Sequence, residues 1–218
     1  MVTSTVAAFD VDGTLLDGES LFRFLGTLLG PPGLAAVCVR TAVRAAARLP
    51  RLDRDTGKAA LLRTALCGRG VAQTESVGQY FAERLLATRV RPDALQALRA
   101  HQAAGHQVVL ISASPGMYIR PLGSLLGVDG ALCTELEVGA DGTYTGALSG
   151  SNARGIEKLH LLDRWLAQQG LQRDQVLIHA YGDSSGDDEL LAAAGSRAQD
   201  RRRQRVLAFD VPPPDLRS

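Results

Sequence analysis

Acidic residues that could act together follow two separate apolar runs of this chain. Asp10 and Asp12 come after TVAAF, and Asp183 and Asp187 come after VLIHAY, while Ser112 ends a third run, QVVLI. Carboxylates that crowd together need a cation or a proton to balance their charge. A ligand set made only of oxygen atoms favours a hard cation such as Mg²⁺. These residues therefore predict an acidic, metal-binding site, provided that the fold brings them together.

Lysine is rare in this chain, which has 22 arginines and only two lysines, Lys58 and Lys158. Lysine supplies a compact ammonium where arginine supplies a planar fork. An ammonium, a hard cation, a hydroxyl and the amides of a glycine turn are together what a phosphoryl group requires. A carboxylate in such a site can act as the nucleophile and form an aspartyl-phosphate. The combination indicates phosphoryl chemistry.

The apolar runs are typical of strands buried on both faces, at 5–9, 107–111 and 176–181. Helical patterns occupy 19–49 (with a break at 30–33), 53–67, 73–88, 93–104, 116–126, 155–169 and 187–194. We therefore predict an α/β fold, a Rossmann-like doubly wound parallel sheet with a small helical cap inserted after the first strand. The core domain would comprise residues 1–16 and 92–218, and the cap residues 17–91. Such sheets bind ligands at the carboxyl ends of their strands, where these polar residues would meet.

Two weaker strand signals complete the pattern. Apolar residues alternate on both sides of a glycine turn over 131–148, which predicts a hairpin, and RVLAFD at 205–210 predicts a last strand. The four histidines are spread along the chain, and we interpret them as surface or packing residues.

The composition of the chain limits its class and its partners. Of its 218 residues, 45% are hydrophobic and 22% are charged, as in soluble globular proteins, and the net charge of +1 predicts no nucleic-acid partner. Cys38, Cys67 and Cys133 form no CxxC pair, so we expect no disulfide framework and a reducing compartment. The N-terminus lacks the features of a signal peptide, and arginines and prolines interrupt the apolar stretch 21–49. We therefore expect a cytoplasmic protein without a membrane span.

Four segments resemble, in order, the motifs of the haloacid dehalogenase (HAD) superfamily. FDVDGTL at 9–15 matches the DxDGT signature, ISAS at 111–114 resembles the second motif, Lys158 fits the third, and GDSSGD at 182–187 fits the fourth. The helical insert, the predicted hairpin and the ASPxxY-like second motif are most similar to subfamily IB. That group includes phosphoserine phosphatases and phosphatidylglycerophosphatase-type enzymes. The resemblance spans nearly the whole chain and implies a Mg²⁺-dependent phosphatase of phosphoric monoesters.

The resemblance also implies a role for each matching residue. Asp10 would be the nucleophile, and Asp12 would protonate the leaving oxygen and then activate water. Ser112 would hydrogen-bond the phosphoryl oxygens, and Lys158 would offset the charge between the nucleophile and the phosphate. Mg²⁺ would be held by Asp10, by Asp183 and by the backbone carbonyl of Asp12, with Asp187 orienting metal-bound waters or Lys158. The residues expected to bind the substrate are Gly13, Thr14, Glu19, Lys58, Ala113 and Ser114.

Two of these residues bear on the substrate. Glu19 stands nine residues after Asp10, where phosphoserine phosphatases place the glutamate that meets the substrate ammonium, and Lys58 falls near their cap arginine. Both favour an amino-acid-like or cationic substrate. The second motif counts against phosphoserine itself, because Ala113 and Ser114 replace the two glycines of the usual SGG.

Arginines of the predicted cap raise a different substrate class. Arg40, Arg44 and Arg48 recur every four residues, with Arg51 three later, so on a helix they share one face. Such a basic amphipathic helix can contact an anionic membrane and present a lipid headgroup to the site, although a solvated cap face explains the pattern equally well. We therefore predict a small phosphorylated metabolite as substrate. A lipid-phosphate phosphatase of the phosphatidylglycerophosphatase type, a phosphoserine phosphatase and a non-catalytic protein that binds a phosphorylated ligand remain alternatives.

Overall fold

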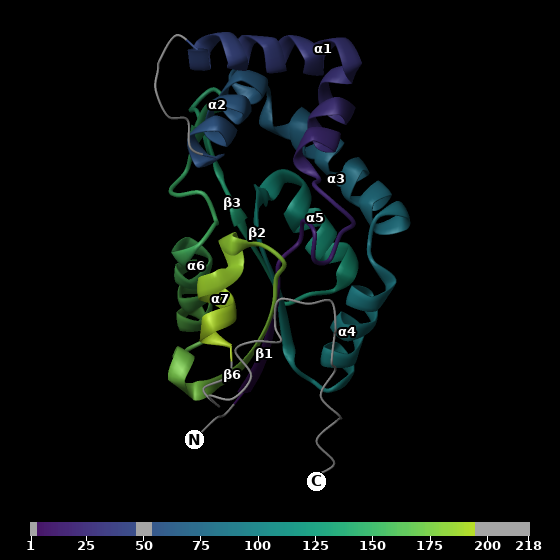
Figure 1. Ribbon diagram of the computed structural model, residues 1–218, viewed down its shortest axis with the longest axis vertical. Helices are drawn as coiled ribbons and strands as arrows, with labels where there is room; N and C mark the ends of the chain where they lie inside the picture. Colours follow the sequence, from purple (N-terminus) through teal and green to yellow (C-terminus); the bar gives the residue numbers. More distant parts are fainter. Residues whose placement is uncertain (1–3, 47–53, 195–218) are drawn as a thin grey trace.

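A four-stranded parallel sheet forms the centre of the computed structural model, which describes residues 4–46 and 54–194 of the chain (Figure 1). The strand order is β3-β2-β1-β6, and the strands are β1 (Ser4–Phe9), β2 (Gln107–Pro115), β3 (Gly130–Thr134) and β6 (Val176–Tyr181). All strand pairs in this sheet are parallel, so the carboxyl ends of the strands lie at one edge. The three strands predicted from apolar runs are confirmed, but β6 is not buried on both faces, because it is the last strand in this order and its Leu177 is 39% exposed. β2 continues past its predicted end at Ser112, because an irregular stretch of pairing carries it on to Pro115, which pairs with Thr134.

Helices cover both faces of the sheet, as predicted for a doubly wound fold (Figure 1). Alternate side chains of a strand point to opposite faces, and in β1 Ala7 and Phe9 belong to one core while Val6 and Ala8 belong to the other. The first core is completed by α3 (Val71–Thr88), α4 (Pro92–Ala103) and α5 (Gly116–Leu126). The second is completed by α6 (Ile156–Gln168) and α7 (Asp188–Ala193). The predicted α/β fold class is confirmed.

Between β1 and α3 the chain forms α1 (Leu21–Ala46) and α2 (Arg54–Leu66), which lie beyond the end of the sheet (Figure 1). The predicted break in α1 occurs at Gly30, where φ is 68° and ψ is 168°, directly before two prolines. By length and composition alone, the helical segment Leu21–Arg44 is apolar enough to cross a membrane, contrary to our expectation from the sequence. Within its most apolar stretch of 18 residues, 17% is buried. Its first half nevertheless contributes Phe24 and Leu25 to the core.

The predicted hairpin over 131–148 is only partly correct. Its first half is β3, which joins the main sheet beside β2, and only β4 (Leu136–Val138) and β5 (Tyr144–Leu148) pair antiparallel. Alternating apolar residues indicate an extended conformation but not the partner of the strand. Cys133 and Thr134 are buried against the main sheet, which explains why this segment pairs there. The strand predicted at 205–210 lies outside the described residues.

Three histidines that we interpreted as separate packing or surface residues lie together on one face of the sheet. His101 of α4 is 1% exposed, and it is hydrogen-bonded to His106 (Nδ1 to Nδ1, 2.8 Å) and to the hydroxyl of Tyr181 (Nε2 to O, 2.8 Å). The ring of His179 lies 5.0 Å from that of His101, centroid to centroid. Burial, with smaller contributions from His179 and His106, lowers the pKa of His101 to about 4. The cluster therefore has a neutral His101 at neutral pH.

We expect this cluster to make the protein less stable in mild acid. An unfolded histidine takes up a proton below a pH of about 6.5, whereas folded His101 does so only near pH 4. The unfolded state thus binds more protons between these values. The contribution of His101 to the free energy of unfolding should therefore be constant above this window and fall within it, by on the order of 3 kcal/mol. Urea unfolding at several pH values measures this slope. His101→Gln should remove this contribution from the pH dependence and the exposed-site control His160→Gln should not; equal pH dependence in both variants would contradict the assignment.

Candidate active site

A cavity of about 550 Å³ lies at the carboxyl ends of the strands, beside α1 and α2. Most of the predicted site residues line it, so the fold brings them together. These residues are Asp10, Asp12, Gly13, Glu19, Lys58, Ser112, Ala113, Ser114, Lys158 and Asp183. Thr14 and Asp187 are buried beside this set, in contact with it rather than in the cavity wall.

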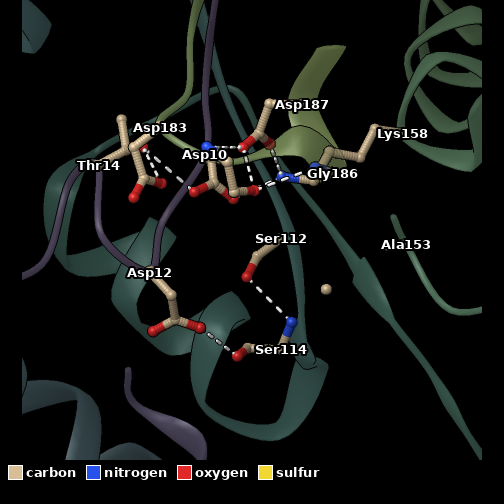
Figure 2. A network of polar contacts seen from close by, with 12 residues as sticks. Asp10, Asp12, Thr14, Ser112, Ser114, Ala153, Lys158, Asp183, Gly186 and Asp187 are labelled. Atoms are coloured by element: carbon tan, nitrogen blue, oxygen red, sulfur yellow. Dashed lines mark hydrogen bonds and ion pairs between the residues drawn. The ribbon is translucent and has the colours of Figure 1, made fainter. Parts of the chain in front are cut away.

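Asp10 is the centre of a buried network of ionic contacts (Figure 2). One carboxylate oxygen accepts a hydrogen bond from Lys158 Nζ at 2.5 Å, and the other accepts one from the Thr14 hydroxyl at 3.2 Å. Lys158 Nζ also lies 2.5 Å from Asp187 Oδ1. The lysine therefore bridges two carboxylates from different parts of the chain. Asp10, Lys158 and Asp187 are 6%, 2% and 0% exposed, so solvent screens these charges weakly.

Burial and charge have opposite effects in this network. Burial raises the pKa of Asp10 to about 7, the charge of Lys158 opposes this rise, and the charge of Asp187 adds to it. For Lys158 burial disfavours the ammonium, but the charges of Asp10 and Asp187 outweigh it and hold the pKa above its usual value. The ammonium is therefore present, and it favours the ionised form of the Asp10 carboxylate.

Three carboxylates in this region are close enough to share a cation. Oxygen atoms of Asp10, Asp183 and Asp187 all lie within 4.8 Å of one another. Asp183 also accepts a hydrogen bond from Thr14 at 3.2 Å, and its carboxylate packs against Gly13. A Cβ atom at Gly13 would lie 2.4 Å from Asp183 Oδ2, and φ at this position is 83°. The glycine of the DxDGT segment is therefore required for the close approach of the β1 loop to Asp183.

Asp12 extends away from this cluster and toward β2 (Figure 2). Its Oδ2 atom accepts a hydrogen bond from the Ser114 hydroxyl at 2.5 Å, and its Oδ1 atom accepts one from the backbone N–H of Ser20 at 2.8 Å. The Ser112 hydroxyl accepts a hydrogen bond from the backbone N–H of Ser114 at 3.0 Å, which fixes the loop around them. The two aspartates of the first motif thus face different parts of one cavity.

Lys58 reaches the cavity from α2. Its Nζ atom donates to the carbonyl oxygen of Ala113 and to Asn152 Oδ1, the latter at 3.2 Å, and Asn152 Nδ2 donates to Asp55 Oδ1 at 2.8 Å. Burial lowers the pKa of Lys58 to about 8, against the opposing charges of Asp12, Asp55 and Glu19. This part of the cavity therefore holds charges of both signs.

Several residues of the site carry no clear signal in the sequence. The residues that were not predicted are Asp55, Asn152 and Arg154 of the cavity wall, together with the buried Ser20 and Tyr118. Asn152 and Arg154 lie in a loop before α6 whose residue types are those of any turn. Only their nearness to Lys158 could have suggested a role in the site.

Comparison with known proteins relates this chain to one family and to several named relatives. The model of the haloacid dehalogenase-like hydrolases matches residues 7–192. Protein CicA of Caulobacter vibrioides is 36% identical over 192 residues, which cover 88% of this chain and 84% of that protein. A Mycobacterium tuberculosis protein named phosphoserine phosphatase SerB1 is 30% identical, covering 88% of this chain and 63% of its own length. A Neisseria meningitidis protein named histidinol-phosphatase is 26% identical, covering 85% of both chains.

Solved structures support the same fold. A Bordetella pertussis protein of unknown function superposes with a TM-score of 0.74 at 24% identity, covering 88% of this chain and 87% of that one. A phosphoserine phosphatase, determined as an analogue of its phospho-aspartyl intermediate, superposes with a TM-score of 0.60 at 18% identity, covering 88% and 84%. At these identities the similarity establishes the fold alone. Together with the family match over residues 7–192, it shows that this chain belongs to the haloacid dehalogenase-like hydrolases.

Proposed function

We propose that this protein is a Mg²⁺-dependent phosphomonoester hydrolase that works through an aspartyl-phosphate on Asp10. The observation that carries the proposal is the buried Asp10 carboxylate, held between Lys158 and Thr14 in a cavity that it shares with Asp12 and Ser112. A binding protein needs no nucleophile and no proton donor in the same cavity. Relatives named phosphoserine phosphatase and histidinol-phosphatase support the same activity.

The proposed reaction has two steps that share one site. In the first, Asp10 attacks phosphorus, a bond forms between its oxygen and phosphorus, and the ester bond to the leaving oxygen breaks as Asp12 protonates that oxygen. In the second, Asp12 takes a proton from water as the water attacks phosphorus, which releases phosphate and regenerates Asp10. Ser112 would donate a hydrogen bond to the phosphoryl oxygens. The Lys158 ammonium offsets the negative charge that Asp10 and the phosphate bring together.

The donor set of the acidic cluster fits Mg²⁺. Its donors are all oxygen atoms, two of its three carboxylates are buried, and their oxygens lie within 4.8 Å of one another. We assign Asp10, Asp183 and the backbone carbonyl of Asp12 as ligands. Asp187 accepts hydrogen bonds on both oxygens, from Lys158 and from Ser184, so we assign it to orient Lys158 and metal-bound water. When bound, the cation supplies positive charge at the phosphoryl oxygens.

We propose a small phosphorylated metabolite with an amino group as the substrate. Glu19 and Asp55 in the cavity suit a substrate ammonium, and Lys58 and Arg154 suit an anionic group. Phosphoserine and histidinol phosphate, the substrates in the names of two relatives, both carry an amine. Three free cysteines among the described residues agree with a cytoplasmic location.

Phosphate release from a panel of esters, with and without Mg²⁺, tests this function. The panel should contain phosphoserine, histidinol phosphate, phosphoethanolamine, sugar phosphates, lysophosphatidic acid and phosphatidylglycerophosphate. We expect Mg²⁺-dependent release from one of the soluble amino esters. Release from none of them by folded protein would refute the hydrolase and leave the ligand-binding alternative.

An exposed part of α1 supports the lipid-phosphate alternative. Val39 and Val43 are 63% and 64% exposed, Arg40 and Arg44 are exposed beside them, and α1 contains no acidic residue. Arg48 and Arg51, which belong to the same predicted stripe, lie outside the described residues. If this face contacts membranes, the protein should float with vesicles that contain phosphatidylglycerol but not with pure phosphatidylcholine vesicles, and Val39→Ser with Val43→Ser should abolish flotation. Equal recovery of the protein with both vesicle types would show that these arginines and valines form only a solvated face.

A further inference from the structure

A chain of buried hydroxyl groups lies behind Asp12, and the proposed reaction does not use it. Ser20 precedes α1, Ser114 is the second-last residue of β2 and Tyr118 lies in α5; they are 1%, 3% and 0% exposed. The Tyr118 hydroxyl lies 3.0 Å from Ser20 Oγ, which in turn lies 3.4 Å from Ser114 Oγ. Ser114 Oγ donates to Asp12 Oδ2 at 2.5 Å. The carboxylate of Asp12 thus contacts Ser114 directly, and Ser20 and Tyr118 extend the series of hydroxyls behind it.

The donor of each contact follows from the number of protons. The Ser114 hydroxyl donates to Asp12 Oδ2, so its single proton points at Asp12. Ser20 must then donate to Ser114, and Tyr118 must donate to Ser20. Burial, followed by the charge of Asp12, raises the pKa of Tyr118 well above its usual value, so the phenol keeps its proton. The hydrogen bonds between these hydroxyl groups therefore all run in one direction, from Tyr118 to the Asp12 carboxylate.

The two ends of this series of hydroxyl groups are fixed, one by side-chain packing and the other by a backbone hydrogen bond. The Tyr118 ring packs against Phe24 and Phe81, with centroid distances of 4.8 and 5.3 Å. The backbone N–H of Ser20 donates to the second oxygen of Asp12, at 2.8 Å. Both carboxylate oxygens of Asp12 are therefore held, by Ser114 on one side and by Ser20 on the other, which leaves its side chain little freedom to rotate.

We propose that Ser114, supported by Ser20 and Tyr118, is a positioning residue that fixes the Asp12 carboxyl in the orientation needed to protonate the leaving oxygen. The inference rests on the proposed function, because it assigns that proton transfer to Asp12. A proton donor must lie about 2.6–3.2 Å from the atom that it protonates, and misplacement by about 1 Å can cost about a hundredfold in rate. A carboxyl that turns freely about its side-chain bonds would spend much of its time outside that range.

The leaving group provides a test that a purely structural role would not pass. An alkoxide is a poor leaving group and needs a proton, whereas p-nitrophenolate leaves without one. Ser114→Ala should lower kcat/KM for an alkyl phosphate such as phosphoserine by about 10- to 100-fold, and that for p-nitrophenyl phosphate less than about threefold. Ser114→Thr, which keeps the hydroxyl, should restore the alkyl activity. Tyr118→Phe, which keeps the ring, should show a smaller loss with the same selectivity.

The control is Ser124→Ala, which removes an exposed hydroxyl of α5 that donates only to the helix carbonyl of Arg120. It should change neither substrate. Equal losses on both substrates in Ser114→Ala and Tyr118→Phe, or no loss on either, would overturn the positioning role while the wild-type enzyme still hydrolyses both. Failure of the folded wild type to hydrolyse either ester would instead overturn the proposed function, and the inference with it.

Discussion

Asp10→Asn should reduce phosphate release by about four orders of magnitude or more, because it removes the nucleophile of the first step. The amide has almost the size of the carboxylate and lacks its charge, so it cannot attack phosphorus at a useful rate. The fold should stay near native, since the neutral amide costs less to bury than the charged group. Steady-state hydrolysis of the best ester of the panel, with circular dichroism to check the fold, measures both effects.

The matched control for this variant is Asp188→Asn, the same substitution at an exposed position one residue after Asp187. Asp188 begins α7 and lies outside the cavity wall, so its loss should leave hydrolysis unchanged and alter stability by less than about 1 kcal/mol. Wild-type rates in Asp10→Asn would show that another group attacks phosphorus.

Lys158→Met should impair both activity and stability. It removes the ammonium that lies 2.5 Å from both Asp10 and Asp187 and leaves two buried carboxylates without their shared partner. Breaking a buried ion pair in this way costs about 3–5 kcal/mol. Hydrolysis should fall by about a thousandfold, on the scale of losing one preorganised charge at the reacting group. Urea unfolding in the presence of a chelator measures the stability without compensation by a divalent cation.

Arg164→Met is the control on the same helix. Arg164 pairs with Glu157 at 2.8 Å on the surface of α6, with its side chain 59% exposed, so removing this cation should cost less than about 1 kcal/mol and leave hydrolysis intact. If both variants lose the same small amount of stability, the Lys158 network does not hold the site together.

The strands and the charged centre of the site could be predicted because their signals are local. VLIHAY is apolar except for His179, and Asp183 follows it after Gly182. Parallel pairing then brings the ends of β1, β2 and β6 to one edge, whatever the details of packing. For this reason the location of the acidic cluster followed from the sequence.

The parts that could not be predicted depend on contacts between distant segments. β3 pairs with β2 rather than forming a long hairpin with β5, because alternation specifies exposure and not partner. Ser20 and Tyr118 are 98 residues apart and meet only after the start of α1 packs on α5. A serine directly before a helix is usually interpreted as an N-cap, so no local sequence feature indicates that Ser20 lies beside Asp12.

Identifying the residue that carries the phosphoryl group tests the proposed mechanism most directly. Asp12→Asn should still form the intermediate from p-nitrophenyl phosphate, whose leaving group needs no proton, but should hydrolyse it slowly for want of a base. The protein is mixed with this ester and Mg²⁺, quenched in acid, digested and analysed by mass spectrometry. We expect one phosphoryl group on Asp10, removed by hydroxylamine and absent in the double variant with Asp10→Asn. A burst of p-nitrophenol with the phosphoryl group on another residue, or on none, would contradict it.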